Sequence, residues 1–433
     1  MLSRVSPHRC IKLRPHYYNT VRSLTTETIS SPGPSLPPPG PPPPHLKHPA
    51  SPKPLSRTRL NPAPRPVVVH RRQALPYLPP TFGRNQILPV TDATRALLED
   101  IVAQFNAPIR YAFAYGSGVF EQDGYKKSGE GGKEEGPMLD FIFAVTHSDH
   151  WHSINMNQYP AHYPLHARAL GSSFVAKVED LSPGVWFNTY VPMKGVTIKY
   201  GVTTVDNLCS DLLNWKTLYL AGRMHKPIRI IKDDARVRLT QQVNLTSAIR
   251  AALLTLPESF TETELFERIA GFSYTGDVRM LLPAENRGKV GNIVRKQEEQ
   301  FKELYHRLVV ALPGVHWQSY SSRMIQQDIS PQSRAAHLRK LPTNLLKGVT
   351  KHYESASLPA RESDESVYWA RLAGDEKFSE VLQNEIGNIV RYPSLVQSMK
   401  GVVSAGLGKS LRYSTAKVGK WWTSSGGSKE SSS

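Results

Sequence analysis

The sequence predicts an α/β fold followed by a mostly helical region. Up to about residue 235, short apolar runs typical of strands alternate with amphipathic helical patterns, which is the arrangement of an α/β domain. From 239 to 310, helical patterns dominate. The length of 433 residues allows two or three domains with a sizeable core.

The first predicted helix begins at the N-cap residues Thr91 and Asp92 and ends near residue 106. Residues 121–137 are rich in Gly, Lys and Glu and are expected to form an exposed, mobile loop between two strands. Asp206 is expected to cap a helix over 206–221. The expected strands are 109–115, 140–145, a hairpin of 185–191 and 196–200 around 192–195, and 227–231.

The helical region is expected to contain helices over 239–256, 262–271 and 292–310. Thr261 and Glu264 have the spacing of a capping box for the second of them. Three helices with short connections suggest a small module of winged-helix type. Residues 331–433 are expected to be less globular.

The N-terminus has the composition of a targeting sequence. Residues 1–30 carry interleaved arginines and apolar residues, with no acid before Glu27, which is typical of a mitochondrial presequence; the alternative is a disordered basic tail. Of the formal charge of +18, residues 1–85 contribute +12 and the rest only +6, so a broad nucleic-acid-binding surface is not expected.

Residues 31–81 are expected to be a disordered linker, because 18 of the 35 prolines lie in 31–80. Removal of a presequence would leave Cys209 as the sole cysteine, which fits a reducing compartment. Five histidines between His147 and His166 lack a recognised metal-ligand pattern, and we do not predict zinc there.

The most informative motif is an apolar run that ends in Gly116-Ser117-Gly118, followed by a second run with Asp140 at its start. Nucleotidyltransferase-type sites are built in this way. Glycine lets the backbone approach a triphosphate, Ser117 and neighbouring amides donate to phosphate oxygens, and Asp140 can hold Mg²⁺ or another divalent cation. Each half of the motif alone is also compatible with an ordinary tight turn or strand start.

Basic residues downstream are candidates for phosphate contacts. Lys199 is the first candidate for a triphosphate contact, and the alternative is a solvated strand lysine. Arg223 and Lys226 are candidates too, or they cap the end of a helix. Asp277 and Arg279 either pair with each other or leave Arg279 to contact a lipid phosphate.

The segment 392–422 is basic and amphipathic, with no acid between Glu385 and Glu430. Its apolar runs are too short to span a bilayer, and the segment suits the surface of an anionic membrane. The alternative is a helix that packs on the protein body. The residues expected to contact the membrane are Lys400, Lys409, Arg412, Lys417, Lys420, Trp421 and Trp422.

Several segments together resemble the mitochondrial CDP-diacylglycerol synthase (phosphatidate cytidylyltransferase) family, whose members are also called mitochondrial translocator assembly and maintenance proteins. The resemblance covers roughly 95–310, with an echo at 389–394 and 398–406. The segments that carry it are 111–120, 138–145, 198–201, 211–215, 218–223, 226–227, 256–260 and 273–280.

This resemblance implies a nucleotidyltransferase fold with a winged-helix-like domain and peripheral attachment to the matrix side of the mitochondrial inner membrane. It implies transfer of CMP from CTP to phosphatidic acid, which feeds phosphatidylglycerol and cardiolipin synthesis. We expect the catalytic residues Ser117, Asp140 and Lys199, and nucleotide contacts from Gly116, Ser117, Gly118, Tyr200, Arg223 and Lys226.

The sequence departs from many nucleotidyltransferases, because Ile142 stands where an Asp-x-Asp pair would have its second acid. A second metal ligand would then come from elsewhere, and Asp211 or Asp206 are the candidates. Two alternative functions remain compatible with the motif, a matrix nucleotidyltransferase that acts on RNA and a non-enzymatic membrane-bound assembly factor for protein import. A homo-oligomer is compatible with the sequence.

The predicted organisation therefore has five parts. They are a presequence (1–30), a Pro-rich linker (31–81), a nucleotidyltransferase domain (82–235), a winged-helix-like domain (236–330) and a C-terminal extension with the membrane-binding segment (331–433).

Overall fold

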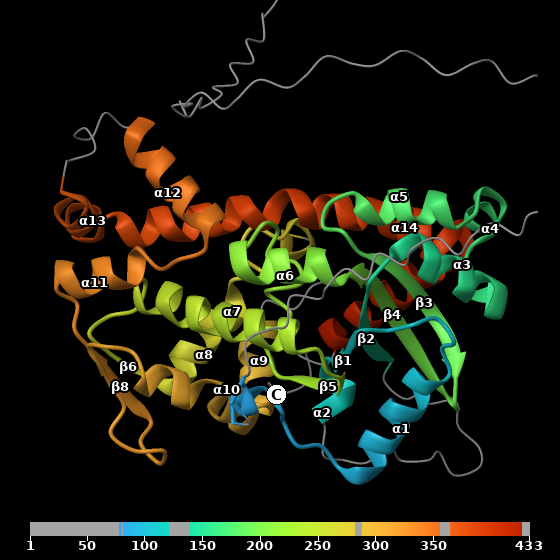
Figure 1. Ribbon diagram of the computed structural model, residues 1–433, viewed down its shortest axis with the longest axis horizontal. Coiled ribbons are helices and arrows are strands. Elements are labelled where there is room, and N and C mark those ends of the chain that lie inside the picture. The colour runs from blue at the N-terminus through green and yellow to red at the C-terminus, as the bar shows by residue number, and fades with distance from the viewer. Residues whose placement is uncertain (1–77, 80, 121–137, 282–287, 356–363, 427–433) are drawn as a thin grey trace, which may run out of the picture. The chain divides into compact units, whose positions relative to one another are not determined.

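The computed structural model (Figure 1) describes residues 78–79, 81–120, 138–281, 288–355 and 364–426. Within these ranges the side chains of Ser117, Val402 and residues 405–426 are not described. The expected presequence, most of the Pro-rich linker and the expected loop at 121–137 lie outside the described residues, so these expectations stay predictions.

Five strands form a mixed sheet in the order β3-β4-β2-β1-β5. β2 and β4 are parallel, while the other three neighbouring pairs are antiparallel. This sheet confirms the predicted α/β fold class. The strands are β1 (Tyr111–Tyr115), β2 (Leu139–Val145), β3 (Trp186–Met193), β4 (Val196–Thr204) and β5 (Ile228–Lys232).

Side chains alternate between two apolar clusters along β2. Phe141 and Phe143 are fully buried in one cluster, and each contributes roughly 1.5–3 kcal/mol by its burial. Ile142 points into the larger cluster on the other face. Helices that contribute to the first cluster are α1 (Asp92–Ala103) and α3 (Ser148–Gln158), and those of the larger cluster include α6 (Val205–Asn214) and α7 (Ala235–Leu253).

Several local predictions are confirmed. The Thr91 side chain accepts a hydrogen bond from the amide of Thr94 at the start of α1. The capping box of Thr261 and Glu264 is present at the start of α8 (Glu262–Gly271). β3 and β4 form the expected hairpin, with Lys194 and Gly195 both at positive φ in its turn.

Two helix predictions need correction. The helix expected over 206–221 is α6, which is capped by Thr204 and ends at Asn214, because Trp215 adopts a left-handed conformation with φ 51°. The helix expected over 292–310 is two helices, since Gln297 leaves the helical conformation between them. These are α9 (Lys289–Lys296) and α10 (Glu298–Val310).

A small antiparallel sheet accompanies the helices α7 to α10. Its strand order is β6-β8-β7, and no strand was expected in this part of the chain. Gln327 ties it to the end of α7 by donating to the carbonyls of Leu253, Leu256 and Pro257. The strands are β6 (Ser259–Thr261), β7 (Val315–His316) and β8 (Met324–Gln327).

The C-terminal part is more ordered than predicted. It contains α11 (Pro331–Leu338), α12 (Thr343–Ser355), α13 (Glu365–Ala373) and α14 (Phe378–Gly426). Leu338, Leu345 and Leu382 are fully buried in the same apolar cluster as the helices α6 and α7. The expectation that 331–433 is less globular is therefore wrong for the described helices.

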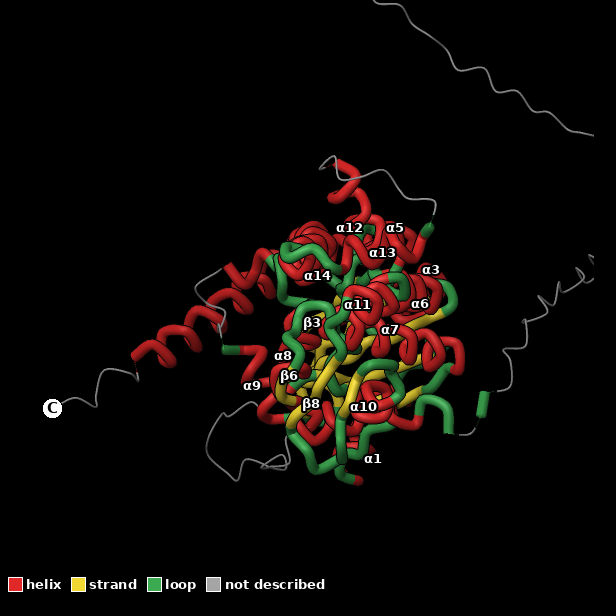
Figure 2. The backbone as a smooth tube through the Cα atoms, turned by 90° about the vertical axis from the view of Figure 1, so that its left-hand side faces the viewer, coloured by secondary structure: helices red, strands yellow, loops and turns green. Residues whose placement is uncertain are grey.

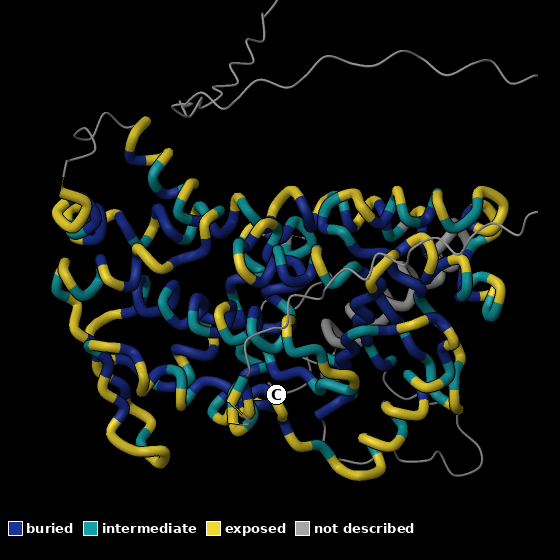
Figure 3. Tube along the Cα trace, viewed as in Figure 1, coloured by how far each residue is buried: buried dark blue, intermediate teal, exposed yellow. Residues whose placement is uncertain are grey.

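The described side chains of α14 include buried ones from Phe378 to Ser404 (Figure 3), and the end of the helix extends away from the packed helices (Figure 2). Phe378, Leu382 and Ile386 form part of its buried stripe. Lys400 belongs to this buried stripe and not to a membrane-facing set. Its ammonium group donates to the carbonyls of Glu179 and Leu181, at 3.0 and 2.8 Å.

Among the described residues, no helix is both long enough and apolar enough to cross a membrane.

Candidate functional site

Strand pairing brings Tyr115, Asp140 and Lys199 side by side. Asp140 is in register with Tyr115 on β1 and with Lys199 on β4. Because Asp140 lies two residues before Ile142, it faces the larger apolar cluster. The Lys199 ammonium nitrogen is 3.5 Å from Oδ1 of Asp140, and each side chain is about one quarter exposed.

Gly116 follows β1 and gives the backbone access to this carboxylate. Its φ is 95°, which favours glycine, and an added Cβ would lie 3.6 Å from Oδ2 of Asp140. The short helix α2 (Ser117–Phe120) begins at the next residue. The predicted phosphate-binding turn therefore lies against Asp140, while the side chain of Ser117 is outside the described residues.

A glycine also shapes the environment of Lys199. An added Cβ at Gly201 would lie only 2.6 Å from the ring of Phe187 on the neighbouring strand, so the ring packs closely against this glycine. The Lys199 ammonium group lies 4.6 Å from the centre of that ring. Phe187 thus supports Lys199 by a cation–π contact.

Asp140 has an oxygen that suits a cation. Oδ1 is buried and accepts no hydrogen bond from the described residues. Among the described residues there is no group of three or more His, Cys, Asp or Glu side chains that could hold a metal ion. One carboxylate with open coordination positions fits Mg²⁺, which binds through one or two carboxylates plus substrate phosphates and water.

The geometry gives Asp211 a structural role. Its buried carboxylate accepts five hydrogen bonds, from the amides of Thr217, Leu218, Leu220 and Ala221 and from the Thr217 hydroxyl. Both oxygens are therefore occupied in holding the turn after α6. The alternative candidate, Asp206, is exposed and pairs with Arg236. The contacts of Asp211 and Asp206 therefore do not support either residue as the predicted second metal ligand.

Tyr200 lies on the opposite face of β4 from Lys199, because neighbouring side chains alternate along a strand. It is fully buried, and its hydroxyl hydrogen-bonds with Asn155 and His162. The nucleotide contact predicted for Tyr200 has no support in this geometry. The alternation was visible in the sequence and would have excluded Tyr200.

The histidines His152 and His162 belong to the same buried network rather than to a metal site. His152 hydrogen-bonds with Tyr163 at 2.7 Å and with Glu179 at 2.8 Å. This network fills the space between β4 and the helices α3 and α5 (Ser172–Asp180).

A cationic group lies beyond Tyr115. The Arg223 guanidinium stacks on the ring of Tyr219, 3.7 Å from its centre, and lies 5.8 Å from that of Tyr115. Nε of Arg223 is buried and has no acceptor among the described residues, which suits an anionic ligand. Burial and, secondarily, the Asp140 carboxylate raise the pKa of Tyr115, so its hydroxyl stays protonated between Asp140 and Arg223.

Arg279 on η3 (Val278–Leu281) belongs to the same group, since its charge interacts with that of Arg223, and it is held by Asp277 directly before η3. Nε and a terminal nitrogen of Arg279 donate to the buried Asp277 carboxylate, at 3.0 and 2.6 Å. The structure therefore contains the Asp277–Arg279 pair that the sequence allowed. The pair fixes the guanidinium and leaves 42% of the Arg279 side chain exposed.

Lys226 completes the cationic group. Its ammonium donates to the carbonyl of Gly222 and the hydroxyl of Ser273, and lies 4.9 Å from the centre of the Tyr274 ring. Burial, and then the charges of Arg223 and Lys289, lower the pKa of Lys226 to about 7. The predicted Arg223, Lys226 and Arg279 are thus brought together, while the supporting Tyr115, Phe187, Tyr219, Ser273 and Tyr274 were not predicted.

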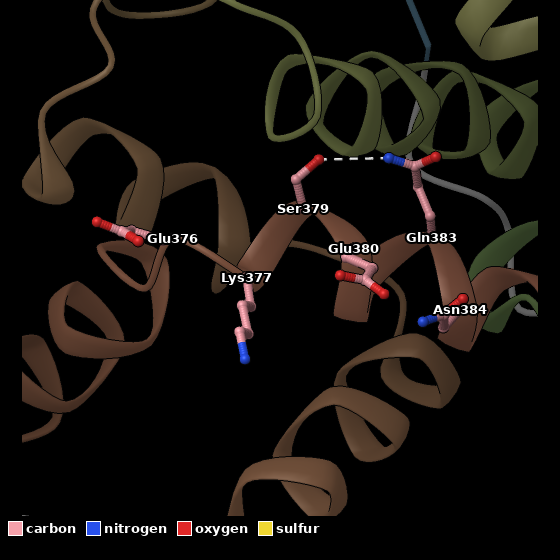
Figure 4. Close-up of a pocket in the computed structure, with 6 residues that line it drawn as sticks. All are labelled: Glu376, Lys377, Ser379, Glu380, Gln383 and Asn384. Atoms are coloured by element: carbon pink, nitrogen blue, oxygen red, sulfur yellow. Dashed lines mark hydrogen bonds between the residues drawn. The ribbon is translucent and has the colours of Figure 1, made fainter.

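One surface pocket lies away from the candidate site residues. It has a volume of about 520 Å³ at the start of α14 (Figure 4) and is lined by Glu376, Lys377, Ser379, Glu380, Gln383 and Asn384. Its side chains are polar, and Gln383 donates to Ser379 at 3.3 Å. None of the predicted site residues lines it, so we assign the site from the strand register instead.

A mixed sheet with Gly-Ser after one strand and a carboxylate on its neighbour defines a nucleotidyltransferase-type protein. The family described as "Phosphatidate cytidylyltransferase, mitochondrial" matches residues 98–420, and the chain belongs to this family. This membership confirms the resemblance found in the sequence.

Relatives with that name span most of the chain. The protein from Danio rerio is 39% identical over 338 residues, which cover 77% of this chain and 97% of the relative. That from Schizosaccharomyces pombe is 37% identical over 354 residues, covering 78% and 87%. That from Saccharomyces cerevisiae is 42% identical over 232 residues, covering 53% and 59%.

The structural role of Asp211 predicts a stability change. Replacing Asp211 by Ala leaves several buried amides without an acceptor, and we expect the free energy of unfolding to fall by about 3 kcal/mol or more. Asp206→Ala on the same helix is the control, since an exposed ion pair contributes about 0–1 kcal/mol. Urea unfolding measures both. Normal stability of Asp211→Ala together with an altered Mg²⁺ requirement would instead make Asp211 a metal ligand.

The lowered pKa of Lys226 predicts a pH-dependent affinity for phosphates. Lys226 is charged below about pH 7 and loses its proton as the pH rises, whereas an arginine stays charged. Binding of inorganic pyrophosphate to the wild type should therefore weaken by about tenfold relative to Lys226→Arg between pH 6 and 9. Calorimetric titration measures both affinities, and their ratio cancels the ionisation of pyrophosphate itself. Parallel pH profiles would show that Lys226 does not contact the anion.

Proposed function

We propose that this protein transfers CMP from CTP to phosphatidate and produces CDP-diacylglycerol and pyrophosphate. The observation that carries the proposal is the juxtaposition of Asp140 and Lys199 with Arg223 and Arg279, in a chain of the phosphatidate cytidylyltransferase family. One carboxylate faces several cations, as a reaction between two phosphate-bearing substrates requires. Family membership favours this lipid reaction over the RNA and assembly-factor alternatives.

The reaction needs charge neutralisation and alignment more than proton transfer. A phosphate oxygen of phosphatidate, already ionised, attacks the α-phosphorus of CTP, and the bond from that phosphorus to the bridging oxygen of pyrophosphate breaks. No strong general base is needed to form this nucleophile. The obstacle is the approach of two anions, which fixed cations lower by stabilising the charge of the transition state.

We assign the triphosphate to the turn of Gly116, Ser117 and Gly118, together with Lys199. Support comes from the positive φ of Gly116 and from the contact of Lys199 with Asp140. Asp140 would hold Mg²⁺, consistent with its buried Oδ1, which accepts no hydrogen bond from the described residues and has the Lys199 ammonium nitrogen at 3.5 Å. The ion, when bound, supplies charge neutralisation on the phosphate oxygens.

Arg223, Lys226 and Arg279 are the residues to which we assign binding of the phosphate groups that meet at the α-phosphorus. Arg223 stacks on the ring of Tyr219 and adjoins Tyr115, so it can contact the nucleotide phosphates. Arg279 is fixed by Asp277 but partly exposed, which suits the phosphate of the incoming lipid. Arginine is suited to this role because it stays charged and presents a rigid fork of donors.

We further propose peripheral attachment to the matrix side of the mitochondrial inner membrane. The relatives are named as mitochondrial proteins, and the N-terminal residues have the composition of a presequence. The last part of α14 carries Lys409, Arg412, Lys417, Lys420, Trp421 and Trp422 without an acidic residue, which suits anionic lipids.

The role of Asp140 predicts a large kinetic effect. Asp140→Asn should lower turnover of CTP with phosphatidate by at least ~100-fold, or about 2.7 kcal/mol of transition-state stabilisation. Ser117→Ala should be milder, because neighbouring amides share the phosphate. Production of CDP-diacylglycerol is the readout, and circular dichroism checks the fold. Near-normal turnover in folded Asp140→Asn would remove the assignment of this residue as the metal ligand.

The membrane role of the end of α14 predicts a difference between two assays. Removal of residues 409–433 should reduce binding to vesicles that contain phosphatidate and activity on them, because it removes the basic and tryptophan residues. Detergent-dispersed phosphatidate should restore most of the activity, since the packed half of α14 up to Ser404 remains. Equal losses with vesicles and detergent would mean that the removed segment supports the fold or the site.

A further inference from the structure

Three strongly exposed leucines lie on or directly after the helices α4 and α5, which contact each other. Leu165 and Leu170 lie at the two ends of α4 (Leu165–Leu170) and are 77% and 60% exposed. Leu181 follows α5 and is 55% exposed. We call these three residues the leucine face. Leucine side chains this exposed have no role in the folded core and leave apolar area in contact with water.

α14 carries a second exposed apolar row, which we call the α14 stripe. Its residues are Tyr392, Leu395, Met399 and Val403. Their spacing of three, four and four residues places them on one line of the helix. The buried stripe of the same helix, which includes Lys400, holds α14 on the protein body. α14 therefore has two apolar sides, and none of the described residues covers the second.

Lys400 links the end of α5 to the buried side of α14. Its ammonium group donates to the carbonyls of Glu179 and Leu181, so the end of α5 lies against α14 between Met399 and Val403. Figure 1 shows the labels of α4, α5 and α14 next to one another, in agreement with these hydrogen bonds. The leucine face and the α14 stripe are thus fixed relative to each other.

The charges around these residues match an anionic partner. His166, Arg168 and Lys177 are exposed on α4 and α5, and α14 has no acidic residue after Glu385. Of the acids on or beside α5, Glu179 is buried, while Asp180 and Asp149 are exposed and Asp149 accepts hydrogen bonds from Ser172 and Ser173. Separate apolar side chains among basic residues suit shallow insertion into the headgroup region of an anionic bilayer.

The position of the α14 stripe relative to the candidate site gives an independent argument. Gly276 and Gly387 are packed so closely that an added Cβ on Gly276 would lie 2.4 Å from the Gly387 carbonyl oxygen. The amide of Val278 lies 3.5 Å from the hydroxyl of Ser394, next to the first residues of the stripe. The stripe therefore begins beside η3, which carries Arg279.

We propose that the leucine face and the α14 stripe form one membrane-docking surface that inserts into an anionic bilayer. It acts in addition to residues 409–422 and sets the orientation of the protein, with Arg279 near the level of the lipid phosphates. The inference rests on the proposed function in that the substrate is a bilayer lipid. It adds a contact made by the sheet-bearing part of the chain.

The test is a triple variant of the full chain, Leu165→Ser with Leu170→Ser and Leu181→Ser. Its matched control is Met324→Ser with Val310→Ser and Ile329→Ser, which removes comparably exposed apolar residues elsewhere. In sedimentation with phosphatidate and phosphatidylcholine vesicles, the leucine variant should bind at least about tenfold more weakly, since insertion of apolar side chains drives binding. The control should bind like the wild type.

A fluorophore reports insertion directly and does not depend on a loss of binding. An environment-sensitive dye on Leu170→Cys should shift to shorter emission wavelengths when vesicles are added, and the same dye on Val310→Cys should not. Unchanged binding of the triple leucine variant, or no shift at position 170, would overturn the proposal. So would gel filtration in which the wild type is a dimer and the leucine variant a monomer, because a second copy would then cover the surface.

Activity on detergent-dispersed phosphatidate separates this inference from the proposed function. The triple leucine variant should keep wild-type activity there, since none of the three leucines belongs to the site. If the wild type itself makes no CDP-diacylglycerol in detergent, the proposed reaction fails, while the vesicle and fluorescence results still decide the docking surface.

Discussion

The register between β2 and β4 is the constraint on which the candidate site depends. Parallel pairing opposes Asp140 and Lys199, and the antiparallel pairing of β1 with β2 adds Tyr115 to the same row. A slip of one residue would turn each side chain to the other face of the sheet. The alternating burial of Phe141 and Ile142 in two different clusters prevents such a slip, so the apolar core specifies the position of the polar site.

The cationic residues of the site come from distant parts of the chain that are held together by backbone packing. Arg223 lies in the turn that Asp211 organises, and Arg279 lies on η3, which packs against α14 through Gly276 and Gly387. The carboxylate of Asp211 and the close approach of two glycines therefore position cations that they do not themselves contact. In the same way, α14 links the cationic group with the surface that we assign to the membrane.

Sequence patterns predicted most of what is local. Strand alternation, the cap at Thr91 and the box of Thr261 and Glu264 depend on neighbours within a few residues, and each is confirmed. The end of α6 was not predictable in this way, because Trp215 adopts a left-handed conformation without being glycine. The order of the C-terminal helices was missed for a similar reason, since their apolar residues are buried against helices far away in the sequence.

In the candidate site, too, the local features were predicted and the tertiary ones were not. The motif around Gly116 and Asp140 was visible in the sequence, and the strand register brings its two halves together. The aromatic side chains that immobilise the cations, such as Tyr219 and Phe187, were not predicted, because only tertiary packing brings a ring next to a cation. The nucleotide contact predicted for Tyr200 finds no support, because period-two alternation in β4 places Tyr200 on the face opposite Lys199.

The central claim is that the site joins the α-phosphorus of CTP to the phosphate of phosphatidate. The most direct measurement follows radiolabel from CTP into lipid extracts, with the label placed at the α-phosphorus in one reaction and at the γ-phosphorus in another. The account predicts that only the α-label enters the lipid fraction and that the γ-label is recovered in pyrophosphate. A γ-label in the lipid, or no label in the lipid from either nucleotide, would contradict it.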